Sequence, residues 1–439
     1  MSKDYTKKTG VEIEVILLRY GPEWHDRIAA EFAAKGDGFD MAAWDSQSVA
    51  EFASGGHIEL LNSYIKGSSK LSFDDFLPTA LKHYGEYPAG SGQIWAIPIN
   101  QDTVGLIYRK DLFEDPTEKA NFQKKYGYPL GVPRTCKELM EVAEFFTRPE
   151  KGLYGWGQFS SIEYDLATST SNGFLWSYGG ELWNPKTNEV KGFLDSPASV
   201  DGLKQYLKMF NYAPPESRLW GYLEVNNYFR QGKLAMGFQW YTFFEAMANP
   251  KKSPYADKTG FANLPGAVGR DGMFRRQISM GGQGLGINTY SKKKKQAWAF
   301  IEWFMQREQQ WLYSTMGQTG RKDILVDPRW QTLNKYNRHF HEAMTHVNDY
   351  WHLPEYYKLL EVLQQEVANA IYGKKTAKEA LMDAAVKALM DAAVKHEAIL
   401  LQAGYKIRRS ESPPEVPDTI VDPVGQELPA GTHLGGRRR

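Results

Sequence analysis

Several common features are scarce or absent in this sequence, and each absence narrows the possible functions. Cys136 is the only cysteine among 439 residues, so no disulfide can form within the chain. The formal net charge of +1 removes the electrostatic argument for a nucleic acid partner. No run approaches the roughly 20 apolar residues of a membrane helix, and no metal-ligand spacing, GxSxG elbow or triad order stands out. After Met1 the chain opens on a polar segment in which no export signal is visible.

Aromatic residues, by contrast, are abundant. They make up 14% of the chain and include 13 Trp and 25 Tyr. Amphipathic rings in such numbers suit a site that stacks on flat polar ligands, although most of them must belong to the core. A chain of 439 residues is too long for one ordinary core, so two domains are expected.

The first hundred residues have the pattern of an α/β domain with a mostly parallel sheet. Residues 11–18 and 39–44 are predicted strands, and a predicted helix over residues 22–34 separates them. Ligands bind at the carboxyl ends of strands in such sheets, which makes Trp44, Asp45 and Gln47 candidate contacts. An N-cap role for Asp45 and a core position for Trp44 explain the same residues without a ligand.

Polar residues also end two later predicted strands. Asn100, Gln101 and Asp102 follow a strand over residues 94–99, and Trp240 and Tyr241 end a strand over residues 234–240. Rings that stack on the apolar face of a sugar, beside amides and carboxylates that bind its hydroxyls, are typical of a sugar site. Helices are predicted over residues 135–146, 165–178 and 197–212, and Cys136 is expected to be a buried structural thiol in the first of them.

The stretch MGGQGLGINTYSKKKKQAWAFIEWF, residues 280–304, predicts a Gly-rich turn, a short strand over residues 285–287 and a helix capped by Ser291. In that helix Ala297 and Ile301 lie on one face. Its glycines precede the strand and lysines follow it, which is the wrong order for a dinucleotide fingerprint. We therefore reject nucleotide binding.

The last third of the sequence is predicted to be helical over residues 354–372 and 376–403. Within the second helix the octapeptide ALMDAAVK occurs at residues 380–387 and again at 388–395, which we interpret as a duplication that extends an exposed helix. Residues 406–439 are Pro-rich and free of aromatics, a composition that predicts a disordered tail.

Taken in order, these motifs resemble those of bacterial ABC-transporter extracellular solute-binding proteins of the carbohydrate type, the group that includes maltose-binding protein. The segments that carry the resemblance are KKTGVEIEV, FDMAAWDSQ with GHIELLN, IWAIPINQDTVGLIYRKDLF, VPRTCKELMEVAEFF, FLWSYGGELW, NNYFRQGKLAMGFQW and GGQGLGINTYSKKKKQAWAFIEWF. They extend to about residue 405 in the family's order.

The resemblance implies a type II periplasmic-binding fold, in which two hinged α/β lobes close on a solute in the cleft between them. The first lobe would be residues 1–108 plus 280–319, and the second would be residues 109–279 plus 320–405. It also implies a monomer on the periplasmic or extracellular face, an ABC permease as partner, and neither a cofactor nor a metal. The implied ligand contacts are Trp44, Asp45, Gln47, Asn100, Asp102, Trp176, Trp240, Tyr241, Gly282, Gln283 and Arg321.

One departure from the family pattern is that members begin with an export signal and an apolar strand, whereas this chain starts within the following helix. The duplicated octapeptide and the tail are a second departure. Among other classes, a glycosidase using Asp45 and Asp102 as acid and base remains an alternative. Polyamine cargo would need several acidic contacts, and Arg321 argues against it. A purely structural module would leave the aromatic and amide clusters unexplained.

Overall fold

The computed structural model describes residues 1–18, 21–315 and 318–388. Its centre is a six-stranded sheet built on two long strands, β2 (Ile97–Arg109) and β7 (Ile278–Ile287). The main path through the sheet is β1 (Met41–Asp45), β7, β2 and β3 (Met236–Trp240), while β4 (Thr259–Ala262) pairs with β2 and β8 (Val347–Asn348) with β7. A separate hairpin pairs β5 (Ala267–Val268) with β6 (Phe274–Arg275).

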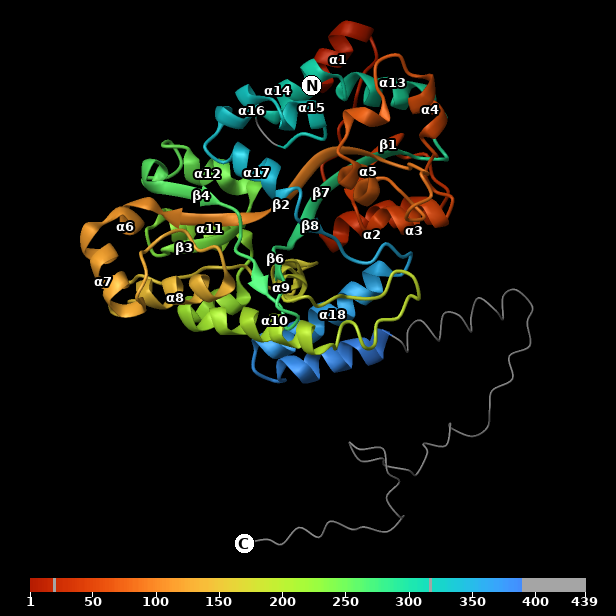
Figure 1. The fold of residues 1–439 in the computed structure, drawn as a ribbon. Coiled ribbons are helices and arrows are strands. Elements are labelled where there is room, and N and C mark those ends of the chain that lie inside the picture. The colour runs from red at the N-terminus through yellow and green to blue at the C-terminus, as the bar shows by residue number, and fades with distance from the viewer. Residues whose placement is uncertain (19–20, 316–317, 389–439) are drawn as a thin grey trace, which may run out of the picture. The chain divides into compact units, whose positions relative to one another are not determined.

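Strand β2 changes partners along its length. Its first half, up to Thr103, pairs with β7, and from Val104 onward it pairs with β3 and β4. Figure 1 shows β2 and β7 side by side near β1 and separating beyond it, so that β2 enters one group of helices while β7 runs on to β8 and α9. The two strands therefore connect two separately packed regions.

The apolar residues form separate cores on the two sides of this junction. Helices α1 (Ser2–Thr9), α4 (Asn62–Gly67) and α13 (Lys294–Phe304) surround one cluster, whose members include Tyr5, Leu61 and Ile301. Next to it, α2 (Pro22–Ala33) and α3 (Ser48–Ser54) contribute Phe32 and Phe52 to a second cluster. Helix α5 (Pro78–Tyr84) adds Tyr84 to a small third cluster.

The largest core begins where β2 leaves β7 and is covered by most of the remaining helices. It contains Val104, Trp156, Trp330 and Trp351, among many others. The helices after β2 are α6 (Lys110–Glu114), α7 (Pro116–Tyr126), α8 (Cys136–Phe146), α9 (Leu166–Ser177), α10 (Pro197–Met209), α11 (Tyr222–Arg230) and α12 (Phe244–Ala248). After α13 come α14 (Arg307–Ser314), α15 (Lys322–Leu325), α16 (Pro328–Leu333), α17 (Asn337–Ala343) and α18 (Tyr356–Ile371).

The helix predictions are confirmed to within a few residues for α8, α9, α10 and α18. In α8 the Thr135 hydroxyl accepts a hydrogen bond from the Glu138 amide, and Cys136 is buried as expected. Residues 377–388 are helical too, whereas the second ALMDAAVK copy beyond residue 388 and the tail over residues 406–439 lie outside the described residues. No helix in the described part of the chain is long and apolar enough to cross a membrane.

Three predictions about strands were wrong: a strand over residues 11–18, a strand that ends at residue 99, since β2 continues to Arg109, and a mostly parallel sheet. Residues 11–18 are described but form no strand, and Val15, Ile16 and Leu17 are 58%, 53% and 89% exposed. Their alternating pattern favours a half-buried strand, but none of the described strands pairs with them. The sheet is also antiparallel at every pairing except that of β7 with β8. The expected parallel pairing is absent because β7, from a distant part of the sequence, lies between β1 and β2 and is antiparallel to both.

The glycines of the 280–304 stretch lie within β7, not in a turn before it. The helix that follows starts later than expected, since α13 begins at Lys294 with Lys293 as its N-cap residue. The Ser291 hydroxyl instead donates a hydrogen bond to Asp40 Oδ1 at 2.6 Å and accepts one from the Lys293 amide at 2.9 Å. Ala297 and Ile301 are buried on the predicted face.

Candidate functional site

Strand β7 brings together predicted contacts from three separate parts of the sequence. Asp45, at the end of β1, lies opposite Gln283, and Asp102 in β2 lies opposite Gly281. The Asn100 side-chain amide donates to Gln283 Oε1 at 3.1 Å. Two carboxyls and two amides are thus placed within one small area of the sheet.

The glycines of β7 are required by what lies against them. Gly282 has φ +97°, and a Cβ added there would lie 1.9 Å from the Asn100 carbonyl oxygen. A Cβ on Gly281 would lie 2.5 Å from the Trp240 ring. Side chains other than hydrogen are excluded from both positions, so the Trp240 ring can pack directly on the backbone of β7. That ring also stacks on Phe159, with ring centroids 6.3 Å apart.

Asp102 is almost completely buried beside Trp240. Its Oδ1 accepts hydrogen bonds from the Thr103 amide at 2.9 Å and from the Thr242 amide at 3.4 Å. Burial nevertheless raises the pKa of the Asp102 carboxyl to about 7, because the two amides compensate only in part for the lost hydration. Near neutral pH this carboxyl is therefore present in both its protonated and its ionised forms.

A second pair of carboxyls lies at the end of β1. The Tyr164 hydroxyl donates to Asp45 Oδ2 at 2.9 Å and joins the segment before α9 to β1. Asp165 is 4% exposed, and burial together with the charge of Asp45 raises its pKa to about 8. A protonated carboxyl donates as well as accepts hydrogen bonds, which is the combination that a sugar hydroxyl also offers.

Gln47 extends the group toward the C-terminal part of the chain. Its side-chain amide approaches Asp349 Oδ1, with a nitrogen to oxygen distance of 3.5 Å. Close by, Ser48 Oγ and the Tyr356 hydroxyl are 3.0 Å apart. The end of β1 is thus in contact with both the start of α9 and the segment from β8 to α18.

Four predicted contacts lie apart from this group. Trp44 is 1% exposed and packs edge-on against Phe52, which is the core position left open as its alternative. The remaining three are also held by other parts of the protein: Trp176 is buried on α9 in the largest core, the Tyr241 hydroxyl donates to Asn263 Oδ1 at 2.8 Å, and Arg321 forms ion pairs with Asp75 at 2.6 Å and Asp323 at 2.8 Å.

Other residues of the group were missed by sequence reasoning, namely Tyr84, Tyr164, Asp165 and Asp349. The Tyr84 hydroxyl donates to the Gly281 carbonyl and accepts from the Asp102 amide. Asp165 was recognised only as the start of a predicted helix. Tyr164 has φ +51°, an uncommon backbone conformation that its sequence context does not reveal. Asp349 reaches β1 through tertiary packing alone.

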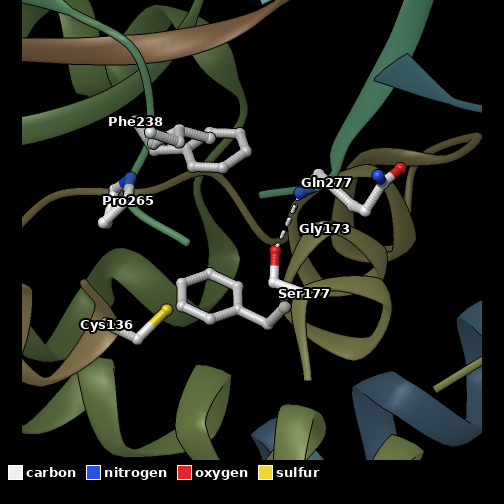
Figure 2. Close-up of a pocket in the computed structure, with 8 residues that line it drawn as sticks. Cys136, Gly173, Ser177, Phe238, Pro265 and Gln277 are labelled. Carbon is white, nitrogen blue, oxygen red and sulfur yellow. Dashed lines mark hydrogen bonds between the residues drawn. The ribbon is translucent and has the colours of Figure 1, made fainter. Parts of the chain in front are cut away.

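The hollows in the described structure include one beside α9 and one beside α18. Figure 2 shows the first, between α8, α9 and β3, where Cys136, Gly173 and Phe238 line it and the Gln277 amide donates to Ser177 Oγ at 3.1 Å. No predicted contact lines that cavity. The second is lined by Tyr164, Tyr357 and Gln364 and is open to solvent. It lies beside the tyrosine that contacts Asp45.

Comparison with known proteins agrees with this architecture. The maltose-bound MalE3 of T. maritima superposes with a TM-score of 0.74 at 24% identity, covering 88% of this chain and 93% of that chain. The fold is therefore that of two-lobed periplasmic binding proteins. The family model for "Bacterial extracellular solute-binding protein" matches residues 1–311, and the chain belongs to this family. The family is one of solute-binding proteins, which favours a binding protein over the glycosidase alternative.

Two curated relatives give the range of similarity. A "Probable amino-acid ABC transporter periplasmic-binding protein" of Sinorhizobium fredii is 23% identical over 307 residues, covering 69% of this chain and 64% of the relative. A mannitol-binding protein of Pseudomonas aeruginosa is 26% identical over 287 residues, covering 63% of this chain and 58% of the relative. The chain thus spans less than two thirds of the length of either relative.

Proposed function

We propose that the chain is the solute-binding component of an ABC importer and binds a sugar or a sugar-like polyol. The observation that carries this proposal is the convergence of Asp45, Asn100, Asp102 and Gln283 beside the ring of Trp240. Carboxyls and amides of this kind bind hydroxyl groups, while an indole ring covers the apolar face of a sugar. Maltose bound to the structural neighbour and the name of the mannitol-binding relative support the same class of solute.

Charge in the site favours a neutral polyol over an amino acid. An amino acid solute brings a carboxylate that needs a cationic partner, and Arg321 is instead held by Asp75 and Asp323. Polyamine cargo is disfavoured for a different reason. The raised pKa values of Asp102 and Asp165 leave these carboxyls partly or mostly protonated at neutral pH, whereas a cation requires ionised partners.

The arrangement supports a binding cycle of opening and closure. We place the first lobe at residues 1–108 plus 280–319 and the second at residues 109–279 plus 320–405, with the solute between them. The contact of Tyr164 with Asp45 joins the two lobes so defined, and solute entry requires it to break. The closed, monomeric protein then presents its solute to the permease on the periplasmic or extracellular face.

The test is a binding titration of the full chain with maltose, maltotriose, mannitol and ribitol, followed by calorimetry and by intrinsic Trp fluorescence. We expect saturable binding of at least one of them, recovery of the solute unchanged, and at least about tenfold weaker binding by Asp45→Asn, because one charged hydrogen-bond acceptor is lost. Asp257→Asn is the matched control, since the Asp257 side chain is 90% exposed.

Folded protein that binds none of these solutes would refute the proposal. Equal affinity of the Asp45→Asn and Asp257→Asn proteins would move the binding site elsewhere. Time-dependent appearance of a product would overturn the assignment as a binding protein.

A further inference from the structure

Two histidines and an aspartate from distant parts of the sequence meet beside the candidate site. His83 comes from the last turn of α5, while Asp349 and His352 follow β8. Asp349 Oδ2 lies 3.8 Å from His83 Nδ1 and 3.1 Å from His352 Nε2. The ligand atoms of the three side chains all lie within 4.8 Å of one another.

Burial makes this arrangement unusual. The Asp349 side chain is 1% exposed, and those of His83 and His352 are each 11% exposed. His83 Nδ1 is buried and has no hydrogen-bond partner. An unsatisfied buried ring nitrogen is unfavourable for the free energy of folding. An electron-pair acceptor such as a metal ion would bind both the His83 ring nitrogen and the neighbouring Asp349 carboxylate.

We propose that His83, Asp349 and His352 bind one divalent transition-metal ion of the zinc type. Imidazole nitrogens and a carboxylate oxygen are a donor set that such ions prefer. A tetrahedral ion with bonds of about 2.0 to 2.2 Å separates its ligand atoms by roughly 3.3 to 3.6 Å. The distances of 3.1 and 3.8 Å fall on either side of this range, so small side-chain rotations complete the site.

The protonation states of His83 and Asp349 are those that metal binding requires, and His352 would have to bind as the neutral imidazole. Burial lowers the pKa of His83 to about 4, which keeps its imidazole neutral near pH 7. For Asp349 burial acts to raise the pKa, but the hydrogen bond and the charge of His352 outweigh it, and the pKa is lowered. The positive charges of Lys82 and of a protonated His352 oppose cation binding here, whereas the negative charge of Asp349 favours it.

Neighbouring residues orient the ligands. The second oxygen of Asp349 accepts a hydrogen bond from the Tyr350 amide at 2.8 Å and is approached by the Gln47 amide. Such contacts hold a carboxylate in its coordinating orientation. A bound ion would join α5 to the segment after β8. Because the three ligands are 269 residues apart at the extremes, their sequence spacing gives no sign of a metal site.

The experiment uses the full chain without a histidine tag, stripped with a chelator and titrated with Co²⁺ and then with Zn²⁺ in the absence of any solute. We expect one equivalent of Co²⁺ to give visible absorption bands of a low-coordinate site, and Zn²⁺ to displace it. His83→Gln and His352→Gln should each weaken binding at least about tenfold. His339→Gln, a partly buried histidine on α17, is the matched control and should bind as the wild type does.

Melting temperature provides a second readout. Zn²⁺ should raise the melting temperature of the wild type and of His339→Gln, but not that of the two ligand variants, since ligand binding to the native state stabilises it. No absorption change with folded wild-type protein would overturn the proposal, even if a variant failed to fold. Binding of several equivalents that survives both ligand substitutions would also overturn it, since it would indicate coordination at the surface. Neither result depends on whether the chain binds a sugar.

Discussion

Replacing Asp165 by Asn should change how the stability of the protein depends on pH. The pKa of the Asp165 carboxyl is 3.8 in its unperturbed state and about 8 in the folded protein, where burial and the charge of Asp45 raise it. Between these values the native state holds a proton that the unfolded state has lost. Stability contributed by this group is therefore fully present below pH 4 and is lost as the pH rises toward 8.

The size of the effect follows from the linkage relation. One proton of difference changes the free energy of unfolding by about 1.4 kcal/mol per pH unit. Asn has the same shape and no ionisation, so Asp165→Asn should gain roughly 2 to 3 kcal/mol relative to the wild type between pH 5 and pH 7. Asp102 remains in both proteins, and its own titration cancels in the difference.

Urea unfolding at several pH values, followed by far-UV circular dichroism, measures this difference. Asp257→Asn, at a side chain that is 90% exposed, should give a curve parallel to that of the wild type. If the Asp165→Asn curve is also parallel to that of the wild type over this range, the Asp165 carboxyl is not protonated in the native state and the argument from burial is wrong.

Three further changes test other contacts. Gly282→Ala should destabilise the protein by at least about 2 kcal/mol in urea unfolding, because of its positive φ and the Asn100 carbonyl oxygen 1.9 Å from the added Cβ. Gly272→Ala is the control for backbone strain, because Gly272 has φ +76° and open space around an added Cβ. If both variants lost the same stability, the clash at Gly282 would contribute nothing. Trp240→Ala should weaken solute binding, measured by calorimetry, by about 2 to 3 kcal/mol, because a sugar face of order 100 Å² is no longer covered by the indole ring. Trp240→Phe should restore part of the lost affinity. Unchanged affinity in Trp240→Ala would exclude stacking at this position. Arg321→Met should lower stability by about 1 to 2 kcal/mol without changing solute affinity, because the buried guanidinium loses its pairs with the partly exposed Asp75 and Asp323. An affinity loss at unchanged stability would reverse that assignment.

The sequence was informative wherever a local rule decided the structure. The capping box of Thr135 and Glu138 predicted the start of α8, and the strand end at Asp45 located one of the carboxyls, whereas Asp102 lies in the middle of β2. Each of these signals depends on neighbours a few residues away. Such signals survive folding because the tertiary structure adds to them and does not oppose them.

Tertiary packing decided what the sequence did not predict. A run of glycines is expected in a turn, yet in β7 glycine is required because the Trp240 ring and the Asn100 carbonyl occupy the space of a side chain. Residues 11–18 alternate as a strand does, but a strand also needs a neighbour to pair with. Asp349 reaches Gln47 across 302 positions of sequence, a contact that no spacing rule anticipates.

The change of partner in β2 sets the order in which a solute would meet the site. Rotation of the helices around β3 against those around β1 would twist β2 near Thr103, where it leaves β7. Atoms close to a pivot move least, so Asn100 and Asp102 would keep nearly the same positions throughout. Tyr164 lies on the segment before α9, farther from this pivot. On the proposed binding cycle, a solute would therefore dock first near the pivot, and Tyr164 would close over it last.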